Sequence, residues 1–155
     1  MNQRGNRPIM RHIITVFAGV AALAGGATRL AAQERGYVVI VNQSNPITAV
    51  SSDELSRLFM KKTARWTTGQ EVVPVDLAES APAREQFSQD VHHKPVAAVK
   101  AYWQTMIFSG RGVPPMEAPS EQSVVAFVRS TPGAIAYVSA QVALGPGVRR
   151  IRVDN

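Results

Sequence analysis

The sequence predicts an α/β sandwich, in which helices cover a mixed or largely parallel sheet. Short β-branched runs alternate with amphipathic helical segments along the chain, which favours strands linked by helical crossovers. A hydrophobic content of 45% is typical of a globular protein. No internal repeat and no linker follows Arg35, so the segments after it belong to one unit.

About four to five strands are expected, and four of them can be placed. The segment 37–41 is a continuous β-branched run, which indicates a strand buried on both faces. Pro74 marks the second strand as an edge or a strand end. The last strand alternates Val with Arg, which fits an edge strand with its Arg side chains outward. The predicted strands are 37–42, 72–76, 134–138 and 148–153.

Four helices are predicted between these strands. Ser51 and Glu54 have the spacing of a capping box, and Ser120 is a suitable N-cap for the fourth helix. Ser80 is the predicted N-cap of the second helix, with Pro82 in its first turn. Residues 111–119 hold three Pro and a Gly and are expected to form a long loop. The predicted helices are 52–61, 81–92, 95–109 and 120–130.

The first 32 residues have the order of a secretory signal peptide. A start with three Arg and no acid is followed by the apolar run 13–24 and then by small residues that end at Ala32. We expect removal of 1–32, with cleavage at Ala27 and an uncleaved anchor as alternatives. The remaining domain, 33–155, is long enough to bury a core without disulfides.

The basic character of the chain lies mostly in this N-terminal segment. The net charge is +6, but residues 1–32 hold four of the 17 cations and none of the 11 acids. Residues 33–155 therefore carry 13 cations against 11 acids, a net charge of about +2. This balance gives no reason to expect nucleic acid as a partner.

No catalytic, metal or cofactor site is predicted. The chain has no Cys, which excludes thiolate chemistry and disulfides. His92 and His93 are adjacent and point apart on a helix end, so we expect them to be solvated and to make a poor chelate. Nucleophile-elbow, P-loop and dinucleotide motifs are missing, and the enzyme hypothesis therefore ranks third of three.

One local feature is typical of ligand binding. Ser80 and the backbone N–H groups after it open a helix directly after a strand. In α/β folds, such a helix N-terminus at the carboxyl end of a strand is an anion-binding position. A capped helix with no ligand is the alternative interpretation.

Motifs spread along the domain then resemble a known family. In order they are Asn42 to Pro46, Leu55-x-x-Leu58-Phe59-x-x-Lys62-x-x-x-Trp66, Val73-Pro-Val75, Ser80, Phe87, Ala101-Tyr-Trp103, Ile107-Phe108-x-Gly110 and Pro132-Gly-Ala-Ile-Ala-Tyr-Val138. The series covers about residues 38–140 and resembles the phosphate-type periplasmic substrate-binding proteins of ABC transporters, specifically their short single-lobe relatives. The resemblance implies a single lobe of a type 2 periplasmic-binding-protein fold, a periplasmic location and capture of a small oxyanion such as phosphate.

The sequence departs from that family at the expected anion site. The family has Ser-Gly-Thr at the helix start, where this chain has Ser80-Ala-Pro82. The family's anion-gripping Arg falls on Asp76 here, and Arg84 is a candidate replacement cation. A single lobe also supplies only half of a ligand shell, unless a homodimer completes it.

These points lead to a ranked pair of functions. The first is an exported solute-binding domain linked to ABC-type uptake, whose site comprises Ser80, the amides of Ala81 and Ala83, the loop residues Ser44 and Asn45, and the candidate cation Arg84. The second is a periplasmic interaction or sensory module on the same scaffold. That module has lost anion capture and docks onto a membrane transporter or sensor.

Overall fold

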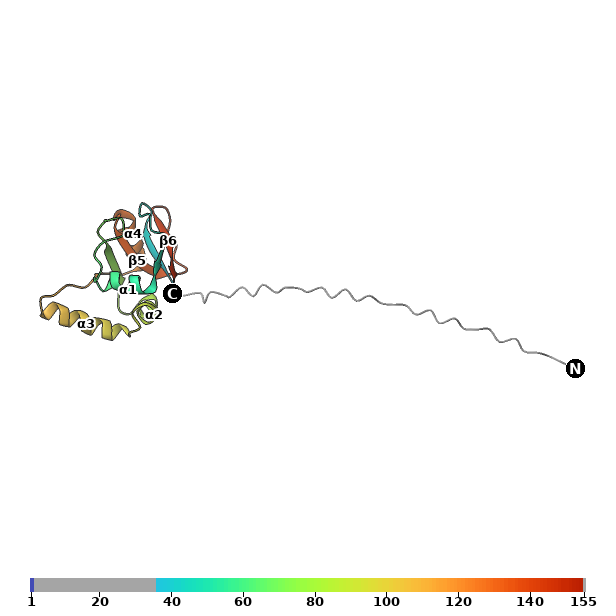
Figure 1. The fold of residues 1–155 in the computed structure, drawn as a ribbon, viewed down its shortest axis with the longest axis horizontal. Helices are drawn as coiled ribbons and strands as arrows, with labels where there is room; N and C mark the ends of the chain where they lie inside the picture. The colour runs from blue at the N-terminus through green and yellow to red at the C-terminus, as the bar shows by residue number, and fades with distance from the viewer. Residues whose placement is uncertain (2–35, 155) are drawn as a thin grey trace. The chain divides into compact units, whose positions relative to one another are not determined.

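The computed structural model describes Met1 and residues 36–154. In it, six strands form one mixed sheet with helices on both faces (Figure 1). The elements are β1 (Tyr37–Asn42), β2 (Ala49–Ser51), α1 (Ser52–Phe59), β3 (Val73–Leu77), α2 (Pro82–His92), α3 (Val96–Phe108), β4 (Met116–Ala118), α4 (Glu121–Ser130), β5 (Ala134–Ser139) and β6 (Val148–Asp154).

The strand order in the sheet is β2-β6-β1-β5-β3-β4. The strands β3, β4 and β5 are parallel to one another, whereas β1 is antiparallel to both β5 and β6. The carboxyl ends of β3, β4 and β5 therefore lie at the same end of the sheet. The carboxyl end of β1 lies at the opposite end of the sheet.

Side-chain alternation divides the core between the two faces of the sheet. On one face, α4 packs against the sheet through Val124, Val125 and Val128, and the Asn42 side chain donates to the Val128 carbonyl at 2.8 Å. On the other face, α1 and α2 cover an aromatic cluster that is described below. The arrangement is an α/β sandwich with a mixed sheet, as the sequence predicts.

An aromatic cluster forms the centre of the second face. The Phe87 ring of α2 stacks on the Tyr137 ring of β5, with centroids 3.8 Å apart and planes 7° apart. Phe59 from α1 packs 4.7 Å from Phe87, and Tyr37 from β1 meets Phe87 edge-on. Because such pairs add about 0.5–1.5 kcal/mol each beyond burial, the cluster fixes α2 firmly over β5.

Three predictions about the sheet need correction. The sheet has six strands rather than four to five, because β2 and β4 were not predicted. β4 falls inside the segment expected to be a loop. The strand β6 is not an edge strand, since β2 pairs with its outer side. As a result Arg149 is half-buried, and it donates to the backbone carbonyls of Asn45 and Ile47.

The helix caps are mostly as predicted. Ser51 caps α1 by accepting from the Glu54 N–H, and Ser120 caps α4 by accepting from the Ser123 N–H. The predicted cap of α2 is wrong, since the N-cap is Ala81 and no side chain caps this helix. Pro82 is the first helical residue, which displaces Ser80 one position too far out to reach the helix amides.

The predicted signal peptide lies outside the described residues. Within those residues, no helix is long and apolar enough to cross a membrane.

Gly133 makes the closest backbone approach in the core. A Cβ added there would lie 2.2 Å from the Glu71 carbonyl oxygen, which belongs to the backbone and has little room to move. The Gly133 carbonyl also accepts from the Val73 N–H and from the Trp66 indole. We expect Gly133→Ala to lower the free energy of unfolding by about 2 kcal/mol, measured by urea denaturation. Gly112→Ala is the control, because its Cβ makes ordinary contacts, and equal losses in the two variants would contradict the argument.

His92 is not the solvated residue that the sequence indicates. It is half-buried, its Nδ1 lies 2.9 Å from the Ser56 hydroxyl, and burial lowers its pKa from 6.5 to about 4, with nearby cations adding to the effect. The unfolded chain therefore binds a proton that the folded protein excludes. We expect the contribution of His92 to the free energy of unfolding to be complete above pH 6.5 and to fall by about 3 kcal/mol as the pH drops to 4, relative to a variant that cannot titrate at this position.

The comparison variant is His92→Gln, which cannot titrate. In urea unfolding at pH 7, 5.5 and 4.5, the wild-type stability should fall toward that of His92→Gln as the pH drops. Parallel pH profiles for the two proteins would show that His92 is not held neutral.

Candidate functional site

A pocket of about 360 Å³ lies where the parallel strands end. It sits at the carboxyl ends of β3, β4 and β5, between the first residues of α2 and α4. Its walls are mostly apolar, with two hydroxyl groups and one carboxylate. The lining residues are Leu77, Ala78, Ala81, Pro82, Ala83, Pro119, Ser120, Glu121 and Ser139.

The start of α2 contributes a backbone donor to this pocket. Pro82 has no N–H, and the N–H groups of Arg84 and Glu85 both donate to the Ala81 carbonyl. With no side chain capping the helix, the Ala83 N–H is the donor left at this end among the described residues. The partial positive charge of a helix N-terminus favours an anion or a hydrogen-bond acceptor at that point.

The start of α4 already holds a negative charge. The Glu121 carboxylate accepts from the Ser139 backbone N–H at 2.5 Å and from the Ser139 hydroxyl at 2.9 Å. It therefore joins the first turn of α4 to the end of β5. The pocket therefore offers one backbone donor on the α2 side and a hydrogen-bond acceptor on the α4 side.

Beside the pocket, a buried ion pair fixes α2 to the sheet. The Asp76 carboxylate of β3 accepts from the Arg84 guanidinium at 2.9 Å and from the Tyr137 hydroxyl at 2.6 Å. Arg84 also donates to the Leu77 carbonyl at 2.7 Å. Asp76 and Arg84 are each only 6% exposed, so the Arg84 guanidinium lies in the protein interior.

Burial dominates the ionisation of this group. It raises the pKa of Asp76 to about 6, while the charge of Arg84 and the hydrogen bond from Tyr137 oppose the rise. It also raises the pKa of Tyr137 far above its usual value, so this hydroxyl stays protonated and donates. At neutral pH the pair is therefore ionised, and its charges cancel inside the core.

The structure brings together only part of the predicted site. Ala81 and Ala83 line the pocket, whereas Ser80 is exposed and lies outside the lining. Arg84 is neither solvated nor directed at a ligand, because it pairs with Asp76.

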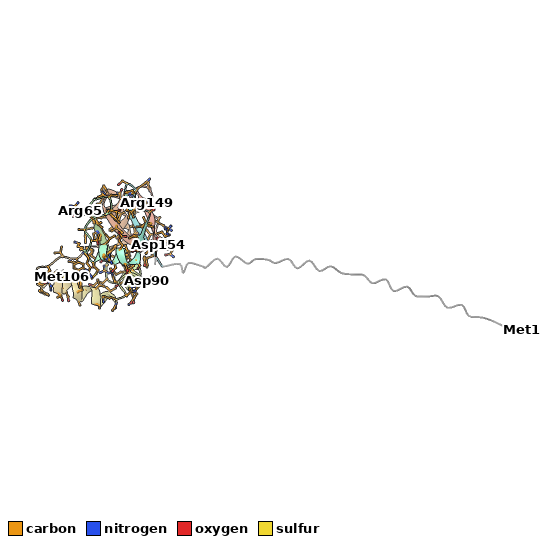
Figure 2. The ribbon with its side chains drawn as sticks, viewed as in Figure 1. Met1, Arg65, Asp90, Met106, Arg149 and Asp154 are labelled. Atoms are coloured by element: carbon orange, nitrogen blue, oxygen red, sulfur yellow. The ribbon has the colours of Figure 1, made fainter. Side chains whose placement is uncertain are left out.

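Ser44 and Asn45 lie at the other end of the sheet. They follow β1, whose carboxyl end is opposite to that of β3. In Figure 2, Arg149, which donates to the Asn45 carbonyl, is far from Met106 of α3. The Asn45 side chain accepts from the Ile47 N–H and shapes its own loop.

Ser120, Glu121 and Ser139 were missed as site residues. The sequence predicts Ser120 only as a helix N-cap and includes Glu121 only as part of the helix 120–130. Placing them beside the Ala81 turn requires β4 to be seen as a strand parallel to β3, and a three-residue strand is too short to show a period.

Comparison with known proteins finds solved structures with a similar fold. No protein-family model matches the chain, and no curated protein matches it in sequence. A solved structure of a possible phosphate ABC transporter substrate-binding protein with bound phosphate, from Clostridium perfringens, matches with a TM-score of 0.60 and 18% identity, over 77% of this chain and 45% of that chain.

Two further solved structures agree. An ABC-type phosphate transport receptor from Vibrio cholerae has a TM-score of 0.53 and 17% identity over 76% of this chain and 46% of its own. A possible phosphate-binding protein from Planctomyces limnophilus has a TM-score of 0.59 and 11% identity over 77% of this chain and 42% of its own. This chain thus spans less than half the length of each of these neighbours.

The fold is therefore similar to part of the fold of phosphate-type ABC transporter substrate-binding proteins. The fold class predicted from the sequence is confirmed, with a larger sheet. These neighbours are binding proteins rather than enzymes. Among the described residues, no cluster of three His, Asp or Glu side chains is arranged to hold a metal ion.

The Asp76–Arg84 pair gives a test of what holds α2 in place. We expect Asp76→Asn to lower the free energy of unfolding by about 3–5 kcal/mol at pH 7, because it leaves Arg84 buried without a counter-charge. The double variant Asp76→Asn/Arg84→Met should be more stable than Asp76→Asn alone, since no unpaired charge remains. Additive losses in urea denaturation of the two single variants and the double variant would mean that the ion pair is not coupled.

Proposed function

We propose that this chain is an exported solute-binding domain that captures a small oxyanion, phosphate first, in the pocket between α2 and α4. One observation carries the proposal. The N-termini of two helices and the carboxyl ends of three parallel strands converge on a single pocket. In α/β folds this is where anionic ligands are held, because free backbone N–H groups and helix dipoles point there.

The pocket chemistry favours an oxyanion that keeps a proton. The Ala83 N–H can donate to a ligand oxygen, and so can the Ser120 hydroxyl when Ser123 is the donor in the hydrogen bond between the two serines. The Ser139 hydroxyl already donates to Glu121. The Glu121 carboxylate requires a donor in return, which a P–OH group supplies. Sulfate carries no proton at neutral pH and would meet Glu121 as an unpaired like charge.

A weak affinity is expected. With Arg84 paired to Asp76, no side-chain cation lines the pocket, and the pocket is open to solvent. A few hydrogen bonds to an anion, each contributing about 1.5–3 kcal/mol before the cost of immobilisation, correspond to a dissociation constant in the millimolar range.

Export and a role in uptake complete the proposal. The basic, apolar and small-residue order of residues 1–32 supports a signal peptide and a periplasmic location. The solved neighbours named as phosphate ABC transporter proteins support a membrane transporter as the partner.

The second candidate function is an interaction or sensory module that has lost anion capture. The Asp76–Arg84 ion pair favours it, because the nearest cation is used inside the core. Such a module would dock onto a membrane transporter or sensor without a small ligand.

A measurement of phosphate binding distinguishes these two candidate functions. We expect phosphate at 20 times its dissociation constant to raise the unfolding temperature of the purified protein, because a ligand specific to the folded state adds about 1.8 kcal/mol there. Sulfate at the same concentration should give no shift. Glu121→Gln should let sulfate bind, since an amide donates where the carboxylate repels. Flat unfolding curves with phosphate, sulfate and molybdate would overturn the proposal in favour of the interaction module.

A matched pair of variants tests the location of the site. Ala81→Asp should stabilise α2 by about 1 kcal/mol as a new N-cap, and it should abolish phosphate binding by placing a carboxylate on the Ala83 N–H. Ser80→Asp adds the same charge one residue earlier, outside the pocket lining, and should retain binding. Equal loss of binding in both variants would indicate a general charge effect rather than a site between α2 and α4.

A further inference from the structure

The pocket between α2 and α4 is larger than a bare oxyanion requires. Its volume of about 360 Å³ falls in the range of about 300–1,000 Å³ that is typical of sites for organic molecules. Phosphate is a single tetrahedral group, and all of its oxygens need hydrogen-bond partners. The pocket therefore has room for a ligand that carries a carbon chain beside its oxyanion.

Most of the pocket wall offers no hydrogen bond to a ligand. Pro82 and Pro119 have no N–H. The N–H groups of Ala78 and Ala81 are already used, since they donate to the carbonyls of Ala118 and Ala78. The apolar lining residues are Leu77, Ala78, Ala81, Pro82, Ala83 and Pro119. A carbon chain is stabilised by covering such a wall, whereas a further ligand oxygen would find no donor there.

The α4 side of the pocket carries a single charge, and that charge is negative. Glu121 is the one lining residue with a charged side chain, because Arg84 lies in the core beside Asp76. Among the described residues, no cationic side chain forms an ion pair with Glu121. A ligand in the pocket therefore meets a carboxylate whose charge has no partner in the described part of the chain.

The Glu121 carboxylate is positioned to accept a further hydrogen bond. Its two oxygens accept from the N–H and the hydroxyl of Ser139, one bond each. A carboxylate has about four acceptor positions, so these bonds orient it and leave acceptor capacity unused. A P–OH group would supply a hydrogen bond there but would leave the negative charge in place. A cationic donor supplies both, because its hydrogen bond to a carboxylate is charge-assisted.

We propose that the ligand of this pocket is a small soluble zwitterion, in which a short carbon chain joins an oxyanion to an ammonium group. The aminoalkyl phosphonates and aminoalkyl phosphates form this chemical class. The ammonium donates to Glu121, the chain lies on the apolar wall, and the oxyanion accepts from the Ala83 N–H. This inference rests on the proposed function, which supplies the oxyanion end of the ligand.

Two phosphonates of equal chain length isolate the role of the ammonium. In 2-aminoethylphosphonate an ammonium stands where propylphosphonate has its terminal methyl group. Both are titrated into the purified protein at pH 7 and followed by NMR amide shifts, with methylphosphonate and inorganic phosphate alongside. We expect 2-aminoethylphosphonate to bind about tenfold more tightly than propylphosphonate. Propylphosphonate should in turn bind more tightly than methylphosphonate, because its chain covers the apolar wall.

A matched pair of variants assigns the ammonium to Glu121. Glu121→Gln keeps the size of the side chain and should reduce the tenfold advantage to about twofold or less. Glu85→Gln removes an exposed carboxylate from the first turn of α2, outside the pocket lining, and should keep the full advantage. An advantage that persists in Glu121→Gln, or that is lost equally in both variants, would overturn the assignment. Since two ligands are compared on one variant, partial unfolding cancels, and the wild-type comparison stands by itself.

The same titrations separate failure of this inference from failure of the proposed function. If phosphate and methylphosphonate bind but the ammonium gives no gain, the zwitterionic ligand is overturned and oxyanion capture stands. If neither phosphate nor any phosphonate binds, oxyanion capture is overturned and this inference falls with it. Sedimentation of the protein with phosphatidylethanolamine vesicles, but not with phosphatidylcholine vesicles, would overturn a soluble ligand in favour of a lipid headgroup.

Discussion

The buried Asp76 carboxylate is the group on which the geometry of the pocket depends. It accepts from Tyr137 of β5 and from Arg84 of α2, so one side chain of β3 joins three elements. Charge burial on this scale is tolerated only because each polar group has a partner within hydrogen-bond distance. The Phe87–Tyr137 stack lies beside it and resists sliding of the helix. The first turn of α2, and with it the Ala83 N–H, is thereby placed at the carboxyl end of β3.

This arrangement also determines the electrostatics of the pocket. The guanidinium of Arg84 neutralises Asp76 within the core, so it adds no net positive charge to the ligand side. What remains for a ligand is the field of two helix ends, the hydroxyl of Ser120, and the carboxylate of Glu121, which the Ser139 hydroxyl already meets. Such a site selects by the pattern of donors and acceptors rather than by total charge. Under the proposed function, that distinction separates protonated from fully ionised oxyanions of similar size.

Much of the fold could be predicted because its signals are local. The β-branched run of β1, the caps Ser51 and Ser120, and the apolar periods of the helices depend on neighbouring residues only. Sheet order depends on contacts between distant residues, so the interior position of β6 and the short strands β2 and β4 were not visible. Only part of the candidate site could be predicted, for the same reason. Ala81 and Ala83 follow from a helix after a strand, whereas Glu121 and Ser139 require the crossover that brings β4 beside β3.

The ion pair between Lys100 and Glu79 connects the pocket to α3. Glu79 lies between Ala78 and the α2 cap Ala81, in the turn that forms one wall of the pocket, and Lys100 lies one turn into α3. Both side chains are well exposed, so the pair contributes little to stability and responds readily to its surroundings. The pair therefore joins the turn before α2 to the first turns of α3 by a weak, solvent-exposed contact.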